Sequence, residues 1–298
     1  MINRSTIKYK LKKILPRSLF VLILTLWRTV FLHIVETIDK LRLKKFTSYR
    51  AVQLTHNGTD FSLYISPANG FIDKHIFLYG VYEPFMLDLI SKHLDRGMTF
   101  IDIGANIGQH SMYAASIVGE TGSVHSFEPI PHLCKQLENS IKRNHFEKII
   151  HTHACALGET EGAEKLHVSK NIGGSSLVTD DDTKEVITVH IKNGDGELER
   201  LSQVNLVKID VEGYEYEVLR GIEKTLLKHK PTILLEFSGE LYNQQENKNG
   251  LHILAFLRTL GYLLYDVEEN MKEILDDTAF NHEIATTRKQ TNLLCVFK

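Results

Sequence analysis

The run from Thr99 to Gly108, TFIDIGANIG, contains the residues best suited to binding a ligand. Apolar, β-favouring residues surround Asp102, and then Gly104, Asn106 and Gly108 follow before a helix-forming segment. Glycines let a ligand approach the backbone closely, and the free N–H groups of a helix start can face that ligand. The pattern predicts a strand, a tight turn and a helix N-terminus that together form a binding site.

A second acidic position follows this turn at a characteristic distance. Glu128 lies 24 residues after Gly104, at the end of the next apolar run. In nucleoside-binding folds such an acid accepts hydrogen bonds from ribose hydroxyls. The turn lacks the G-x-G-x-x-G spacing, and Asn106 can adopt a left-handed conformation in place of a glycine. The spacing therefore favours a ligand smaller than a dinucleotide and disfavours a nicotinamide oxidoreductase.

Strands and helices alternate through the rest of the chain. Strands are expected at 123–127, 204–210 and 232–237, with helices at 131–144 and 214–229, and short strands at 50–54, 61–65 and 76–78. Such alternation predicts a parallel sheet with right-handed crossovers, whose ligands bind at the carboxyl ends of the strands. Asp210 and Glu236 are expected at that edge.

Three blocks of sequence together resemble the FkbM-type class I S-adenosylmethionine-dependent methyltransferases: FIDIGANIGQHSMYAA, SFEPIPHLCKQLENSIKRN and LVKIDVEGYEYEVLRG. The resemblance covers about residues 75–240, and the third block is the distinguishing one. It implies a Rossmann-like, seven-stranded, mostly parallel sheet, here behind an N-terminal helical extension. It also implies S-adenosyl-L-methionine as cofactor and methyl transfer to oxygen, often on sugars or polyketide-like natural products.

The resemblance also implies roles for individual residues. The methionine part of the cofactor is expected near Asp102 and the turn, the ribose at Glu128, the adenine near Ala156, and a lid at Glu83. The full set of expected cofactor-binding residues is Glu83, Asp102, Gly104, Asn106, Gly108, Glu128 and Ala156.

Methyl transfer needs an aligned oxygen and a group that takes its proton. We expect Asp210 to act as this base or to orient it, while Lys208, Glu212 and Glu236 tune the charge. The alternative is a structural ion pair of Lys208 with Asp210 under the cofactor. No metal is expected, because His151 and His153 share one face of a strand without a third ligand.

Charge is divided unevenly along the 298 residues. Residues 1–50 carry 12 Lys/Arg and 2 Asp/Glu, so residues 51–298 carry 23 and 35 of the totals of 35 and 37. The acidic body argues against a nucleic-acid acceptor, and the basic arm indicates an anionic partner such as membrane headgroups. Three scattered cysteines indicate a reducing compartment.

The basic arm has the pattern of an amphipathic helix. Apolar residues recur every three or four positions from Leu11 to Ile38, and the uncharged run 18–27 is too short to span a bilayer. We expect residues 1–45 to lie on the inner membrane surface, so that the protein is cytoplasmic and peripheral on that membrane. The alternative is a helix that packs on its own domain or in a dimer. The expected organisation is an arm at 1–48, a strand-rich lead-in at 49–74 and a methyltransferase domain at 75–298.

The sequence thus predicts an S-adenosylmethionine-dependent O-methyltransferase that acts on a hydroxyl of a sugar, glycan or lipid-linked saccharide. Two alternatives stay open: a methyltransferase for a natural-product or nucleic-acid acceptor, and a non-catalytic, membrane-tethered binding module.

Overall fold

The computed structural model describes residues 35–68, 70–169, 183–238, 250–288 and 290–298, which belong to two compact units, Met1–Thr47 and Ser48–Lys298. In the first unit residues 35–43 are helical, and the rest of the predicted N-terminal helix lies outside the described residues. Within the described ranges, no helix combines the length and the apolar character needed to cross a bilayer.

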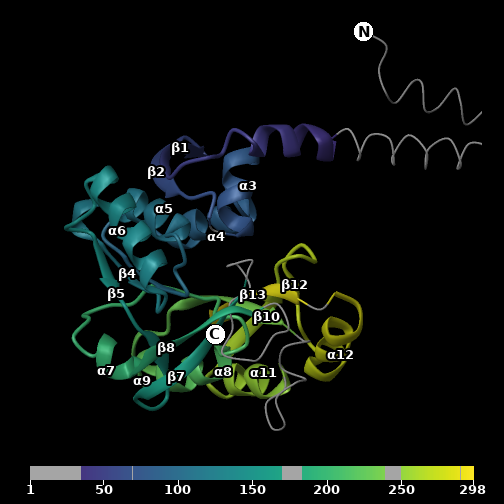
Figure 1. Ribbon diagram of the computed structural model, residues 1–298. Coiled ribbons are helices and arrows are strands. Elements are labelled where there is room, and N and C mark those ends of the chain that lie inside the picture. Colours follow the sequence, from purple (N-terminus) through teal and green to yellow (C-terminus); the bar gives the residue numbers. More distant parts are fainter. Residues whose placement is uncertain (1–34, 69, 170–182, 239–249, 289) are drawn as a thin grey trace, which may run out of the picture. The chain divides into compact units, whose positions relative to one another are not determined.

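An eight-stranded sheet forms the centre of the second unit, with the strand order β12-β11-β13-β10-β9-β3-β4-β5 (Figure 1). The five strands from β10 to β5 are parallel, whereas β13 pairs antiparallel with both β10 and β11. The strands of this sheet are β3 (Thr99–Ile103), β4 (Ser123–Phe127), β5 (Ile150–His153), β9 (Leu206–Ile209), β10 (Thr232–Ser238), β11 (Tyr262–Asp266), β12 (Lys272–Glu273) and β13 (Gln290–Phe297).

This sheet confirms the predicted α/β class and the mostly parallel core. It has one strand more than the seven expected, because the two-residue β12 folds back antiparallel onto β11 at the edge. The helices are α3 (Phe71–Tyr79), α4 (Pro84–His93), α5 (Gln109–Val118), α6 (Pro131–Asn144), α7 (Gly194–Leu198), α8 (Glu215–Gly221), α9 (Glu223–His229), α11 (Gly250–Thr259) and α12 (Asp277–Glu283), with a 3₁₀ turn at Gly119–Thr121 and a π-helical turn at Ile284–Arg288.

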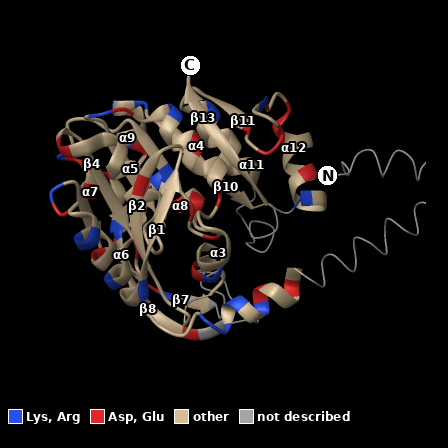
Figure 2. Cartoon of the chain, turned by 90° about the horizontal axis from the view of Figure 1, so that it is seen from above, with Lys and Arg blue, Asp and Glu red and all other residues tan. Residues whose placement is uncertain are grey.

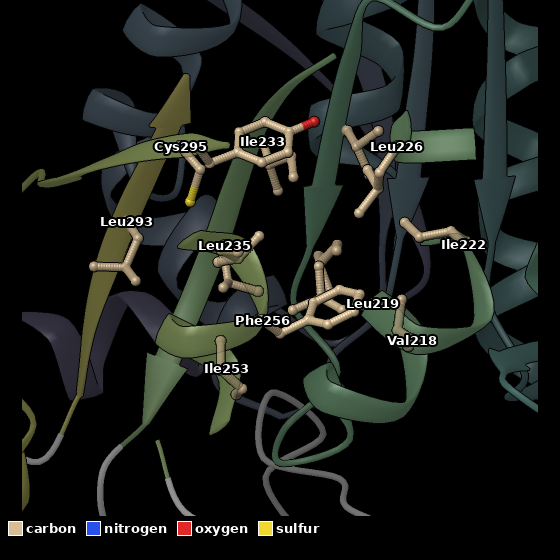
Figure 3. Packing of buried hydrophobic residues seen from close by; sticks show 14 of the residues in the cluster. Val218, Leu219, Ile222, Leu226, Ile233, Leu235, Ile253, Phe256, Leu293 and Cys295 are labelled. Atoms are coloured by element: carbon tan, nitrogen blue, oxygen red, sulfur yellow. The ribbon is translucent and has the colours of Figure 1, made fainter. Parts of the chain in front are cut away.

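A continuous apolar core covers one face of the sheet. Side chains of β10 and β13, such as Ile233 and Leu293, pack against Leu219 of α8, Leu226 of α9 and Phe256 of α11 (Figure 3). All except Phe256 are at most 1% exposed. Burial on this scale holds the strand ends in fixed positions, which a binding site at those ends requires.

A two-stranded ribbon, β1 (Arg50–His56) and β2 (Thr59–Ile65), belongs to the same unit. The backbone N–H groups of Ser62 and Tyr64 donate to Asn144 Oδ1 and Ser140 Oγ of α6 at 2.7 and 3.0 Å. Side chains of a helix therefore satisfy the free edge of β2. Residues 49–74 thus belong to the same compact unit as the eight-stranded sheet.

Two predicted elements differ from the structure. Residues 76–78, expected as a strand, lie inside helix α3, since a three-residue apolar run does not distinguish a strand from a buried helical turn. The helix expected at 214–229 is divided into α8 and α9 at Ile222, whose φ of −113° is not helical.

Three histidines stack at the β5 edge of the sheet. The ring of His125 lies 4.9 Å from that of His151 and 5.5 Å from that of His153, and His153 stacks on Phe127 at 4.2 Å. The rings of His151 and His153 thus pack against neighbouring rings at this edge of the sheet. Burial, with the neighbouring His151 and His153, lowers the pKa of His125 to about 4.

This stack is expected to destabilise the protein in acid. Between pH 6.5 and pH 4 an unfolded chain binds a proton at His125 that the folded chain does not, so the free energy of unfolding falls as the pH drops. Proton binding at His125 lowers the free energy of unfolding by about 1 kcal/mol between pH 7.5 and pH 5.5. Urea unfolding of His125→Gln should show a flatter pH dependence than the wild type. The exposed His190→Gln variant is the control, and an equal change in both variants would contradict the prediction.

Candidate active site

The site lies at the point where the strand order reverses. β3 comes first in the chain among the parallel strands, and β4 lies on one side of it and β9 on the other. Ligands of open α/β sheets bind outside the carboxyl ends of the strands at such a point. A cavity of about 220 Å³ is found there, lined by residues that follow β3, β4 and β9 and by Glu236 of β10.

The turn after β3 forms one wall of this cavity. Gly104, Asn106 and Gly108 all have positive φ angles, of 80°, 50° and 87°. The left-handed conformation predicted for Asn106 is therefore confirmed, and its side-chain Oδ1 accepts a hydrogen bond from Ile107 N at 2.8 Å. The N–H groups of Gly104 and Ala105 both donate to the carbonyl of Phe127 at 3.0 Å, which fastens the turn to the end of β4.

Glu128 connects this turn to the segment after β4. Its two carboxylate oxygens accept from the backbone N–H groups of Asn106 and Ile130, each at 2.9 Å, and the residue is 5% exposed. Burial raises the pKa of Glu128 to about 7, although the two N–H donors favour the ionised form. Each oxygen keeps a second lone pair that can accept another hydrogen bond.

A buried lysine links β3 to β9. Nζ of Lys208 lies 3.2 Å from Asp210 Oδ2 and 3.5 Å from Asp102 Oδ1, and it donates to the carbonyl of Gly104 at 3.3 Å. Burial alone would lower the pKa of Lys208, but the two carboxylates outweigh it and raise that pKa. Lys208 is therefore a cation and not a neutral base, and the expected ion pair with Asp210 is present.

Asp102 does not line the cavity. Its side chain is fully buried behind the turn, where Oδ2 accepts from Ser111 Oγ at 2.6 Å and Oδ1 faces Lys208. Asp102 in this position can affect a bound ligand indirectly, by holding Lys208 and the turn, but not by direct contact. The expectation that Asp102 touches the cofactor therefore needs this correction.

Three acidic residues also line the cavity. One carboxylate oxygen from each of Asp210, Glu212 and Glu236 lies within 4.8 Å of the other two. Oε1 of Glu236 also accepts a hydrogen bond from Gln290 Nε2. Burial and the neighbouring carboxylates raise the pKa values of Glu212 and Glu236, whereas the charge of Lys208 keeps the pKa of Asp210 below its usual value despite burial.

Tyr82 and Glu83 border the cavity ahead of α4. Glu83 has a positive φ of 45°, and burial, with the charge of Asp210, raises its pKa to about 7. Gln109 holds this segment in place, because its Nε2 donates to the carbonyl of Tyr82 at 2.6 Å and its Oε1 accepts from the N–H of Tyr82 at 2.7 Å. The first residue of α5 thus fixes the segment that the sequence predicts as a lid.

Replacing Gln109 by Leu is expected to weaken cofactor binding about tenfold, because two hydrogen bonds worth about 1 kcal/mol each are lost and the lid is released. Isothermal titration with S-adenosylmethionine measures this change. The control is Gln136→Leu, since Gln136 is equally buried and bonded but lies on α6 outside the cavity lining. Comparable losses of affinity in both variants would show that Gln109 has only a structural role.

Apolar residues complete the cavity around Ala156. Phe127 and Ile130 come from the segments next to Glu128. A separate three-stranded sheet, β6 (Ala156–Gly158), β7 (Gly162–Ser169) and β8 (Thr183–Asn193), contributes Leu166 and Val189. Of the residues expected in the site, those that line the cavity are Glu83, Gly104, Asn106, Glu128, Ala156, Lys208, Asp210, Glu212 and Glu236. Gly108 instead caps α5 behind the turn.

Four further residues line the cavity that local sequence patterns did not single out: Gln109, His110, Leu166 and Val189. Gln109 and His110 directly follow the glycine turn, so their position at a helix start was a usable signal. Leu166 and Val189 approach the cavity only because β7 and β8 fold over it, which no local pattern indicates.

The strand order and the cavity at the switch point define a class I methyltransferase. The family model "Methyltransferase FkbM domain" matches residues 102–264, more than half of the chain, and the chain therefore belongs to this family. It is an S-adenosyl-L-methionine-dependent methyltransferase, as the sequence predicts.

Named proteins resemble the chain over its catalytic part. "Methyltransferase 1" of Beauveria bassiana is 28% identical over 200 residues, which are 58% of this chain and 75% of that protein. "Methyltransferase sdnD" of Sordaria araneosa is 27% identical over 186 residues, 52% of this chain and 69% of that protein. The crystal structure of "Methyltransferase FkbM" from Methylobacillus flagellatus KT has 13% identity and a TM-score of 0.41, and the match covers 75% of this chain and 54% of that one.

Proposed function

We propose that this methyltransferase transfers the methyl group to a hydroxyl oxygen of a sugar, glycan or lipid-linked saccharide. The observation that carries the proposal is the composition of one cavity. The turn at Gly104 and the carboxylates of Glu128, Asp210 and Glu236 all line it. Such a cavity offers a place for a nucleoside and, beside it, acceptors for the proton of a hydroxyl group.

The residues present fit S-adenosylmethionine. The free lone pairs of Glu128 suit the two ribose hydroxyls, and Phe127, Ile130 and Ala156 offer an apolar surface for adenine. Several carboxylates surround the single amine of Lys208, which favours a ligand that carries a sulfonium and an ammonium group. Asp102 supports this site indirectly, by holding Lys208 under the turn.

Bound S-adenosylmethionine supplies an electrophilic methyl group, and the chain has to orient the acceptor. Asp210 is held ionised by Lys208, so it can accept a hydrogen bond from the acceptor hydroxyl and take or direct its proton. Glu212 and Glu236 adjust the charge around it. The alternative, in which the pair of Lys208 with Asp210 only supports the cofactor, predicts turnover without Asp210.

The acceptor class also rests on the charge of the chain. The unit from Ser48 onward carries more Asp and Glu than Lys and Arg, and Figure 2 shows residues of both signs scattered along its elements. An acidic body disfavours nucleic acid as acceptor. The basic arm at residues 1–45 would place the enzyme peripherally on the inner surface of the cytoplasmic membrane, where lipid-linked saccharides are found. A natural-product acceptor is the main alternative, and a non-catalytic tethered module would release no S-adenosylhomocysteine.

A screen of cell-envelope saccharides and lipid extracts with methyl-labelled cofactor tests the proposal. We expect label in a saccharide fraction together with S-adenosylhomocysteine. Label only in nucleic acid or in small natural products would replace the proposed acceptor class. Cofactor binding without label in any fraction would favour a binding module.

With an acceptor identified, Asp210→Asn should lower turnover by at least about a hundredfold, because an amide cannot take the proton. Cofactor affinity, measured by titration, should change little. The matched control is Asp60→Asn, an exposed residue of β2. Turnover that survives in Asp210→Asn with the cofactor bound would assign the ion pair a purely structural role.

A further inference from the structure

Three carboxylates of the cavity lie closer together than methyl transfer by itself requires. Asp210 at the end of β9, Glu212 in the next turn and Glu236 in β10 each place one carboxylate oxygen within 4.8 Å of the oxygens of the other two. We propose that these three carboxylates bind one divalent cation of the magnesium or manganese class. The role of the cation in catalysis, though not its binding, rests on the proposed function.

Glu236 supplies the observation that points to a missing ligand. The residue is 8% exposed, and Oε1 accepts from Gln290, but Oε2 is buried and has no hydrogen-bond donor in the part of the chain that the structure describes. One carboxylate oxygen of Glu236 lies within 4.8 Å of a carboxylate oxygen of Asp210. Two carboxylates can remain together only with a proton or a cation between them, and an unsatisfied buried acceptor indicates an ion or water that is bound there.

The nearest cation of the protein does not compensate this cluster. Lys208 approaches Asp210 at 3.2 Å, but it also pairs with Asp102 at 3.5 Å and donates to Gly104 O. One positive charge is thus divided between Asp210 and Asp102, and the buried Glu236 adds a further carboxylate beside Asp210. A hard divalent cation prefers oxygen ligands of this kind and would balance that excess.

A cation at this point would serve the transfer to oxygen. A metal-bound hydroxyl has a lowered pKa, so the acceptor oxygen becomes a better nucleophile near neutral pH. The C–O bond forms as the C–S bond breaks, the electron pair of that bond stays on sulfur as S-adenosylhomocysteine leaves, and Asp210 takes the hydroxyl proton and passes it to water. Asp210 would then position the acceptor through the cation as well as by a direct hydrogen bond.

Manganese binding to the full chain tests this site without cofactor or acceptor. Electron paramagnetic resonance of free Mn²⁺ should show one bound ion per chain, displaced by excess Mg²⁺. Glu236→Gln should weaken binding by at least about tenfold, because the buried oxygen ligand is lost. The exposed Glu273→Gln on β12 should bind as the wild type does. If Glu236→Gln fails to fold, as judged by circular dichroism, Asp210→Asn replaces it.

Titration of the wild type with S-adenosylmethionine separates this proposal from the proposed function. A wild type that binds the cofactor but no Mn²⁺ would overturn the cation site and assign a shared proton to Asp210 and Glu236. Mn²⁺ binding that persists unchanged in both variants would also overturn it. Mn²⁺ binding that is lost in the variants supports the site even if no saccharide is methylated.

Discussion

Glu128→Ala is expected to abolish measurable binding of S-adenosylmethionine. The substitution removes the acceptor proposed for the ribose hydroxyls, and it also leaves the N–H groups of Asn106 and Ile130 without their side-chain acceptor. Each buried donor left unpaired costs about 1–3 kcal/mol, so the turn that forms the cofactor wall should loosen as well. Isothermal titration should show an affinity at least about a hundredfold lower, equivalent to about 2.7 kcal/mol.

A buried carboxylate elsewhere in the unit provides the matched control for this experiment. Asp73 is 2% exposed and accepts hydrogen bonds from the backbone N–H of Ser66 and from Gln136 Nε2, but it does not line the cavity. Asp73→Ala should lower the free energy of unfolding while the folded protein keeps its cofactor affinity. If Glu128→Ala lost stability but bound the cofactor normally, Glu128 would be only a support of the turn.

Local sequence patterns predicted the strand and the helix on either side of Glu128, β4 and α6, correctly. Strand β4 and helix α6 begin and end at the predicted residues, because proline at the start of α6 and the apolar run of β4 are strong local signals. The strand predicted at 76–78 is wrong, because a short apolar run fits a strand and a buried helical turn equally well. The edge strand β12 has only two residues and depends on its pairing with β11, so it leaves no pattern of its own.

The site residues that could be predicted from the sequence are the acidic residues at the carboxyl ends of strands. Glu128, Asp210 and Glu236 line one cavity as their positions at neighbouring strand ends indicated. The sequence placed Asp102 in the strand ahead of the turn, but alternation along a strand did not show that Lys208 and Ser111 hold its side chain behind the cavity. The contacts of Gln109 with Tyr82 connect segments 27 positions apart, and such pairings arise only from the tertiary fold.

Gly104 is the position where a single added carbon should do the most damage. A Cβ atom there would lie 1.8 Å from the carbonyl oxygen of Asp210 and 2.9 Å from its carbonyl carbon, and the φ angle of +80° already disfavours any other residue. β3 and β9 continue side by side past their ends at this point, since Asp210 N donates to Ile103 O at 3.1 Å. The clash therefore acts on backbone, which cannot move aside as a flexible side chain would.

Gly58→Ala is the control for Gly104→Ala, because it places an alanine at a similarly unfavourable φ angle without a steric clash. Its φ angle is +77°, nearly the same, but an added Cβ would meet no atom within 4 Å. Gly58→Ala should therefore cost only the conformational penalty of about 1–2 kcal/mol, whereas Gly104→Ala should cost several kcal/mol in total and eliminate cofactor binding. Urea unfolding and cofactor titration of both variants measure the difference. Equal stability in the two variants, with binding retained in Gly104→Ala, would mean that β3 and β9 can separate at the switch point, and the proposed cofactor wall would have to be abandoned.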